Sequence, residues 1–233
     1  MSWAPRIERW RSVVHGVAPD LPVELILGII WHESRGDAGA IGKGSTKPAV
    51  IPSSSGPMKI NHALGLMQVV PKNIAGWNAE FPKKIATWEQ LTSSSVAGGR
   101  KQIMLGAEIL RGAVAWVTNR YRVPEIAGNP NANLYRIALM VYAWGQGNMR
   151  PYLDQLQEEI GYISLQEIAA RWPDLGAPKN HPVQFSNRVW KKAYSGGPPP
   201  SKPIKVIQPK KKSSRAGLGL LALAGLVWAT TRR

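Results

Sequence analysis

Apolar residues recur at spacings of three and four along most of the first 195 residues, which is the period of an amphipathic helix. The longest such pattern runs from Ala97 to Tyr121 and predicts a helix with a broad apolar face. Further helices are predicted over 6–16, from about Pro22 to Gly36, from a cap at Asn133 to Tyr142, after a capping pair at Ser164 and Glu167, and over 181–194.

Strand patterns are weak in this sequence. No segment alternates apolar and polar residues over a convincing length. The stretch from Gly39 to Met58 is rich in Gly, Ser, Pro and Lys, which predicts a loop. The predicted fold class is therefore mostly α, with at most a small β element in the loops.

The composition changes after residue 195. Residues 196–215 are rich in Pro and Lys and predict an extended or disordered basic linker. Residues 216–231 carry no charge and are rich in Leu, Ala and Gly. As a helix they would span roughly 24 Å at ~1.5 Å per residue, which is short for a hydrocarbon core of about 30 Å. We expect a C-terminal membrane-associating helix; the alternative is an apolar peptide that docks on the domain or on a partner.

Charge is concentrated in the same tail. The chain has 30 Lys and Arg against 14 Asp and Glu, a net charge of +16, and eight of the basic residues but no acidic residue lie in 196–233. This excess predicts attraction to polyanions. Beside an apolar segment, an anionic membrane is a simpler partner for the tail than nucleic acid, and no specific nucleic acid is predicted. The first 16 residues lack the apolar core of a secretory signal.

Glu33 directly follows the almost wholly apolar run ILGIIWH. A carboxyl group in dry, apolar surroundings keeps its proton to higher pH, as a general acid that cleaves a glycosidic bond must. Glycoside hydrolases normally use a second carboxylate. Asp37 is the nearest acid, but Gly36 predicts a break in the helix between them. A lone glutamate at a helix end is more often a plain surface residue.

Further motifs, which occur in a particular order, favour a catalytic role for Glu33 over that of a plain surface residue. The chain reads ES at 33–34, GLMQ at 65–68 followed closely by Pro71, IMLGAEILR at 103–111, Y-x-x-G-x-G from Tyr142, and FSNRV at 185–189. Together they resemble the lytic transglycosylases of glycoside hydrolase family 23, over about residues 5–195. The resemblance implies a lysozyme-like domain, of the goose-type lysozyme and lytic transglycosylase kind, over residues 1–195.

The sequence departs from the family pattern at two positions. The family's AYNAG element reads VYAWG here, so Ala143 stands at the asparagine position. A serine that commonly follows the catalytic glutamate by nine residues is replaced by Gly42.

The resemblance also implies a reaction and a set of site residues. Glu33 would be the only catalytic residue, protonating the oxygen between muramic acid and glucosamine and then taking the proton of the muramoyl 6-hydroxyl as a 1,6-anhydro ring closes. Ser34, Met67, Gln68 and Tyr142 are the predicted substrate-binding residues. From the residues alone, Ser34 is equally consistent with a helix-end role, and Met67 and Tyr142 with core packing. The Gln68 amide offers a sugar both a donor and an acceptor.

Cofactor and metal chemistry are not predicted. The four histidines have no ligand-like spacing, the chain has no cysteine, and the glycines of the tail do not form a nucleotide fingerprint. The predicted binding partner of the domain is the glycan strand of peptidoglycan.

Two other functions remain open at this stage. One is hydrolysis by a muramidase like the goose-type lysozymes, and the other is a catalytically inactive wall-binding virion protein, which Ala143 and Gly42 favour. A wall enzyme without an export signal is typical of a phage. We therefore expect a membrane-associated virion enzyme or one at the host cell membrane, for wall penetration or lysis, with other virion proteins as further partners.

Overall fold

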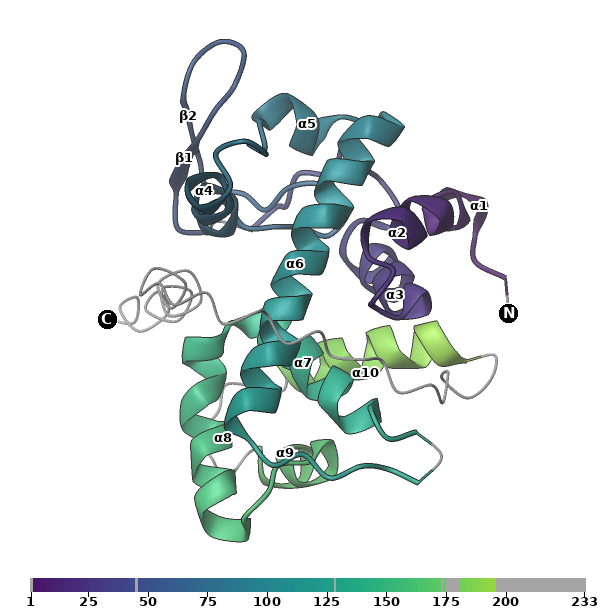
Figure 1. Cartoon of the computed structure of the whole chain (residues 1–233), viewed down its shortest axis with the longest axis vertical. Coiled ribbons are helices and arrows are strands. Elements are labelled where there is room, and N and C mark those ends of the chain that lie inside the picture. The colour runs from purple at the N-terminus through teal and green to yellow at the C-terminus, as the bar shows by residue number, and fades with distance from the viewer. Residues whose placement is uncertain (1, 45, 128, 173, 175–180, 196–233) are drawn as a thin grey trace. The chain divides into compact units, whose positions relative to one another are not determined.

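The computed structural model describes residues 2–44, 46–127, 129–172, 174 and 181–195. Most of these residues are helical, which confirms the predicted class, and a small two-stranded sheet is the β element (Figure 1). The chain divides into two compact units, residues 1–109 and 110–233. The predicted linker at 196–215 and the apolar segment at 216–231 lie outside the described residues. Within those residues, no helix is long and apolar enough to cross a membrane.

The first unit contains α1 (Pro5–Glu8), α2 (Arg11–Val17) and α3 (Val23–Ser34). Both short helices pack on α3, whose residues from Leu25 to Ile30 are fully buried. The single helix predicted over 6–16 is therefore wrong. The chain turns at Trp10, and the indole N–H of this residue donates to the carbonyl of Gly36 (Nε1–O 3.2 Å).

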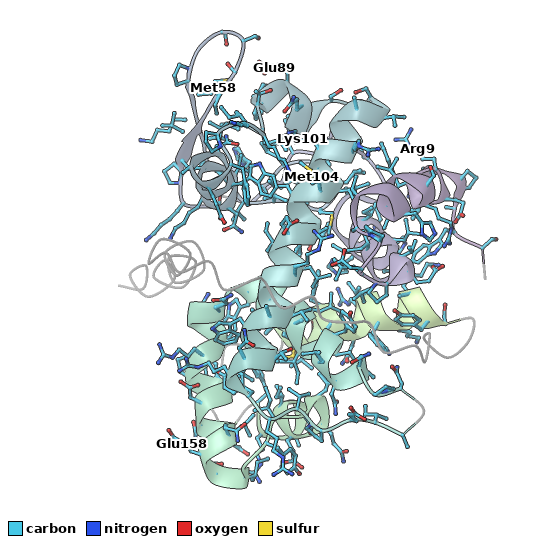
Figure 2. All side chains as sticks on the ribbon, in the orientation of Figure 1. Arg9, Met58, Glu89, Lys101, Met104 and Glu158 are labelled. Carbon is cyan, nitrogen blue, oxygen red and sulfur yellow. The ribbon has the colours of Figure 1, made fainter. Side chains whose placement is uncertain are left out.

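The small sheet pairs β1 (Ala49–Ile51) with β2 (Met58–Ile60) in antiparallel register, Val50 opposite Lys59. The loop predicted from Gly39 to Met58 thus contains a strand, too short to show alternation in the sequence. β1 packs on α4 (Pro71–Glu80), and its Ile51 side chain is fully buried. Glu89 of α5 (Trp88–Thr92), labelled in Figure 2, ties the hairpin turn to this helix. Its carboxylate accepts from Ser54 N (2.8 Å) and Ser54 Oγ (2.9 Å), and these bonds lower the pKa of Glu89 to about 2.

The long helix α6 (Val96–Arg120) matches the strongest pattern of the sequence. The boundary between the two units falls within it, after Ile109. Two of its glycines allow close packing in the first unit. A Cβ at Gly99 would lie 2.2 Å from the ring of Trp10, and one at Gly106 would lie 2.4 Å from the sulfur of Met67.

The second unit contains the end of α6 with α7 (Ala132–Trp144), α8 (Gln146–Ile160), α9 (Leu165–Arg171) and α10 (His181–Tyr194). α7 packs mainly on α10 and also on α8 and α9 (Figure 1). The predicted helix over 181–194 is confirmed. So is the start of α9, where Ser164 Oγ accepts from Glu167 N at 3.2 Å.

Asn133 is not the cap of α7. The helix begins one residue earlier, and Asn133 is buried in its first turn. Its Nδ2 donates to the carbonyl of Pro124 (2.8 Å), and its Oδ1 accepts from Leu165 N (3.4 Å). The amide therefore joins three segments that are distant in sequence, which local pattern alone did not indicate.

Candidate active site

Glu33 is carried by the last turn of α3. The helix ends because Arg35 and Gly36 adopt left-handed backbone angles, with φ of 57° and 85°. Gly36 packs so tightly that an added Cβ would lie 2.6 Å from the carbonyl oxygen of Arg6. The Gly36 carbonyl also accepts from the indole of Trp10 and the guanidinium of Arg9. These contacts fix the position of the backbone just after Glu33.

The carboxyl group of Glu33 is largely removed from water, with 22% of the side chain exposed. Burial raises the pKa of Glu33 to about 7, because the charged form loses its hydration. His32 Nδ1 lies 4.0 Å from Glu33 Oε1, which is beyond hydrogen-bond distance. A group with this pKa is partly protonated at neutral pH and can both give and accept a proton there.

Ser34 is buried, and its hydroxyl serves the end of the helix. Oγ donates to the carbonyl of Ile30 (3.1 Å) and accepts from Gly36 N (3.2 Å). These bonds match the helix-end alternative. Contact between Ser34 and substrate stays a prediction.

Gln68 lies in a tight loop closed by Leu64 and Val69, which exchange two backbone hydrogen bonds of 3.0 Å each. Both Gly65 and Gln68 have positive φ, 74° and 46°, and Gln68 is one of two described non-glycine residues with such an angle. A non-glycine residue held in this region is strained and is often found at functional sites. The loop therefore has a defined backbone conformation with strain at Gln68.

The side-chain amide of Gln68 folds back onto the backbone. Nε2 donates to the carbonyls of Gly65 (2.9 Å) and Ala40 (3.2 Å). Oε1 faces Gly42, where an added Cβ would lie 2.8 Å from it. The position that holds serine in the family pattern thus lies beside Gln68, and its lack of a side chain makes room for the amide oxygen.

Met67 is fully buried against α6 at Gly106. A substrate contact by its side chain would need the loop to move, and this contact stays a prediction. Tyr142 belongs to the second unit, where it is half-buried on α7 and stacks on Phe185 with ring centroids 6.3 Å apart. Trp144 stacks on Tyr152 at 5.6 Å and packs on Trp172, so at least part of its ring surface is used within the unit.

Two carboxylates close to Glu33 in sequence, Glu24 and Asp37, have hydrogen-bond donors of their own. Glu24 accepts from Arg11 and Trp3. Asp37 is exposed and accepts from Gly39 N at 2.8 Å. In the described part of the chain, no group of three or more His, Cys, Asp or Glu residues could hold a metal ion.

Comparison with known protein families identifies the family of the domain. The family model described as "Transglycosylase SLT domain" matches residues 15–162, more than half of the chain. The chain belongs to this family. No curated protein and no solved structure matched. Membership of this family indicates lytic transglycosylase activity on peptidoglycan.

The transglycosylase match spans Glu33, the GLMQ loop and Tyr142, all singled out from the sequence. The structure adds a residue that the sequence argument missed. Gln102 lies on α6 and is fully buried, and its Oε1 accepts a hydrogen bond from Leu66 N in the loop that carries Gln68. A glutamine between Gly99 and Gly106 at helical spacing was the available signal.

Proposed function

We propose that this transglycosylase cleaves the β-1,4 bond between N-acetylmuramic acid and N-acetylglucosamine by intramolecular displacement. Protonated Glu33 gives its proton to the glycosidic oxygen as the bond from that oxygen to muramoyl C1 breaks. The muramoyl 6-hydroxyl oxygen then bonds to C1, and its proton goes to the Glu33 carboxylate. The products are a 1,6-anhydromuramoyl end and a glucosamine 4-hydroxyl, and Glu33 returns to its starting form.

The observation that carries this proposal is the buried carboxyl of Glu33 with a pKa of about 7. One group can serve as acid and then as base only if its pKa lies near the working pH. Glu24, on α3, and Asp37, just after it, each accept hydrogen bonds from other groups. An internal nucleophile removes the need for a second carboxylate that activates water.

We assign the substrate contacts as follows. Gln68 offers Oε1 as an acceptor for a sugar hydroxyl or N–H, because the two hydrogen bonds of its side-chain amide both use the nitrogen. Tyr142 holds an N-acetyl group of the glycan through its hydroxyl. Ser34 and Met67 are the remaining proposed substrate-binding residues, and Ser34 also fixes the helix end beside Glu33.

The test is product analysis on purified peptidoglycan with the wild type and Glu33→Gln. Wild type should release fragments that lack one water relative to reducing-end products, as measured by mass spectrometry. Glu33→Gln should lower the rate by roughly 10²–10⁴-fold while binding to peptidoglycan persists. Reducing ends would instead identify a hydrolase of the goose-type lysozyme kind. A wild type that binds without cleaving would leave the inactive wall-binding protein, to which Ala143 and Gly42 point.

We further propose that the protein works at a membrane, in the virion or at the host cell membrane. The support is the uncharged 216–231 segment with basic residues on both sides, a pattern suited to anionic lipid. Purified particles should contain the protein and lose it when their lipid is stripped. Its presence only in infected-cell membranes would overturn the virion placement.

A further inference from the structure

Gln102 is a fully buried amide in the first half of α6, next to Lys101, which Figure 2 labels. A buried amide needs hydrogen-bond partners, because leaving its polar atoms unpaired costs free energy. Its partners show which parts of the fold depend on it.

The amide binds three separate segments. Oε1 accepts from Leu66 N at 2.9 Å, in the loop that carries Gln68. Nε2 donates to the carbonyl of Ala38 at 3.0 Å, in the segment that follows α3. The same nitrogen also faces three carbonyls at the end of α5, those of Gln90, Leu91 and Ser93, at 3.1, 3.1 and 3.3 Å.

Close packing accompanies these bonds. A Cβ at Gly65 would lie 2.6 Å from Cδ of Gln102 and 2.7 Å from its Oε1. The backbone of the loop therefore rests directly on the amide, with no side chain between them. One turn further along α6, Gly106 receives Met67 in the same way.

The segments held by Gln102 are the ones that hold Gln68. The carbonyl of Ala40 accepts from Gly65 N (2.8 Å) and from Gln68 Nε2 (3.2 Å). The carbonyl of Gly65 accepts the second bond of that nitrogen. Gln102 binds Ala38 and Leu66, which lie two residues before Ala40 and one after Gly65.

We infer that Gln102 is a positioning residue for the reaction. It fixes the Gly65–Gln68 loop to the segment after α3, and so sets the direction in which Gln68 presents its amide oxygen to the glycan. Gln102 acts through Gln68 and does not itself touch substrate. The inference rests on the proposed function, in which Gln68 contacts the glycan.

The test is a double-mutant cycle with Gln102→Met and Gln68→Ala in the full chain. Methionine keeps the length of the side chain and removes both polar groups. We expect Gln102→Met to lower kcat/KM on soluble glycan strands by roughly 10–100-fold, as misplaced binding groups do. The kcat/KM of the double variant should lie no more than about twofold below that of the less active single variant, because both changes remove the same contact.

Asn133→Leu is the matched control, since Asn133 is another buried amide that joins distant segments, within the second unit. It should lower stability, while its effect on kcat/KM multiplies with that of Gln68→Ala. Hydrogen exchange gives a second readout. Exchange at residues 64–69 should accelerate in Gln102→Met, while exchange over 132–144 stays at the wild-type rate.

Several outcomes would overturn the inference. These are a kcat/KM of Gln102→Met equal to that of wild type, fully multiplicative effects with Gln68→Ala, or unchanged exchange at residues 64–69. If Gln102→Met does not fold, Gln102→Asn replaces it in the same cycle, with the same expected coupling. Failure of the proposed function is read separately, as undiminished cleavage by Glu33→Gln.

Discussion

At the scale of single residues, Glu33 couples catalysis to stability. Burial raises its pKa from 4.5 to about 7, so the folded protein holds this proton more tightly than the unfolded chain does. Below pH 4.5 the group is protonated in both states and its burial carries no electrostatic penalty. As pH rises to about 7, the unfolded chain gains the freedom to ionise, and the folded state loses stability relative to it.

We therefore predict that Glu33→Gln stabilises the protein at alkaline pH. The shift corresponds to about 3 kcal/mol, at about 1.4 kcal/mol per pKa unit. Urea unfolding at pH 4 and at pH 8 measures it. Glu33→Gln should match wild type at pH 4 and exceed it at pH 8 by up to that amount. Equal stability of the two proteins at pH 8 would show that Glu33 is not a buried acid.

The same pKa predicts the pH dependence of cleavage. The reaction begins with protonated Glu33, so activity should fall as pH rises through about 7. Initial rates on soluble glycan strands, taken between pH 5 and pH 9, would show this. A descending limb near pH 4.5 would mean that the carboxyl group is solvated.

At the scale of elements, the end of α3 depends on one glycine. Gly36 combines a φ of 85° with backbone contact at the carbonyl of Arg6, so it meets both backbone strain and steric limits. Gly56 has a φ of 107° with open space around it, and Gly44 has open space without a positive φ. Substitutions at these three glycines therefore distinguish the cost of backbone strain from the cost of a steric clash.

We predict that Gly36→Ala lowers the free energy of unfolding by about 3 kcal/mol, the sum of left-handed strain and overpacking. Gly56→Ala should lose only about 1 kcal/mol, from strain alone. Gly44→Ala should change little. Urea unfolding of the three variants gives the comparison, and equal losses at Gly36 and Gly56 would show that contact with Arg6 does not matter.

The helix α6 acts as the scaffold of the first unit. Trp10 packs over Gly99, Gln102 binds the loop at Leu66, and Met67 packs over Gly106. These positions recur every three or four residues and so lie on one face of the helix. Glycine at 99 and 106 makes room for the Trp10 ring and the Met67 side chain, and the Gln102 amide pairs with the backbone of the loop.

At the scale of the whole molecule, the net charge of +16 governs encounter with the wall. Carboxylates and phosphates of bacterial walls are anionic, and their attraction for a basic protein is screened by salt. We predict that binding of Glu33→Gln to purified sacculi weakens steadily from 50 mM to 500 mM salt. A sedimentation assay measures it. Replacing the five lysines of 196–215 with glutamine should flatten the dependence; an unchanged salt dependence would place the attraction in the domain.

The local sequence pattern was enough to predict the helices that have a regular apolar face or a clear capping residue. α6, α10 and the start of α9 follow from helical spacing and capping chemistry, which act over a few residues. The division at Trp10, the short hairpin and the buried place of Asn133 did not follow. Each depends on a partner distant in sequence, such as Gly36 for Trp10 or Leu165 for Asn133.

The sequence also predicted the family. A carboxyl group after an apolar run, with the ES, GLMQ and Tyr142 motifs in order, is enough to predict a transglycosylase, and the family match confirms that class. The tertiary structure decided how Glu33 is buried from water and which atoms of Gln68 already have hydrogen-bond partners. It also decided that Gln102 binds the loop. Burial and hydrogen bonding are properties of groups brought together from distant parts of the chain, so no local pattern contains them.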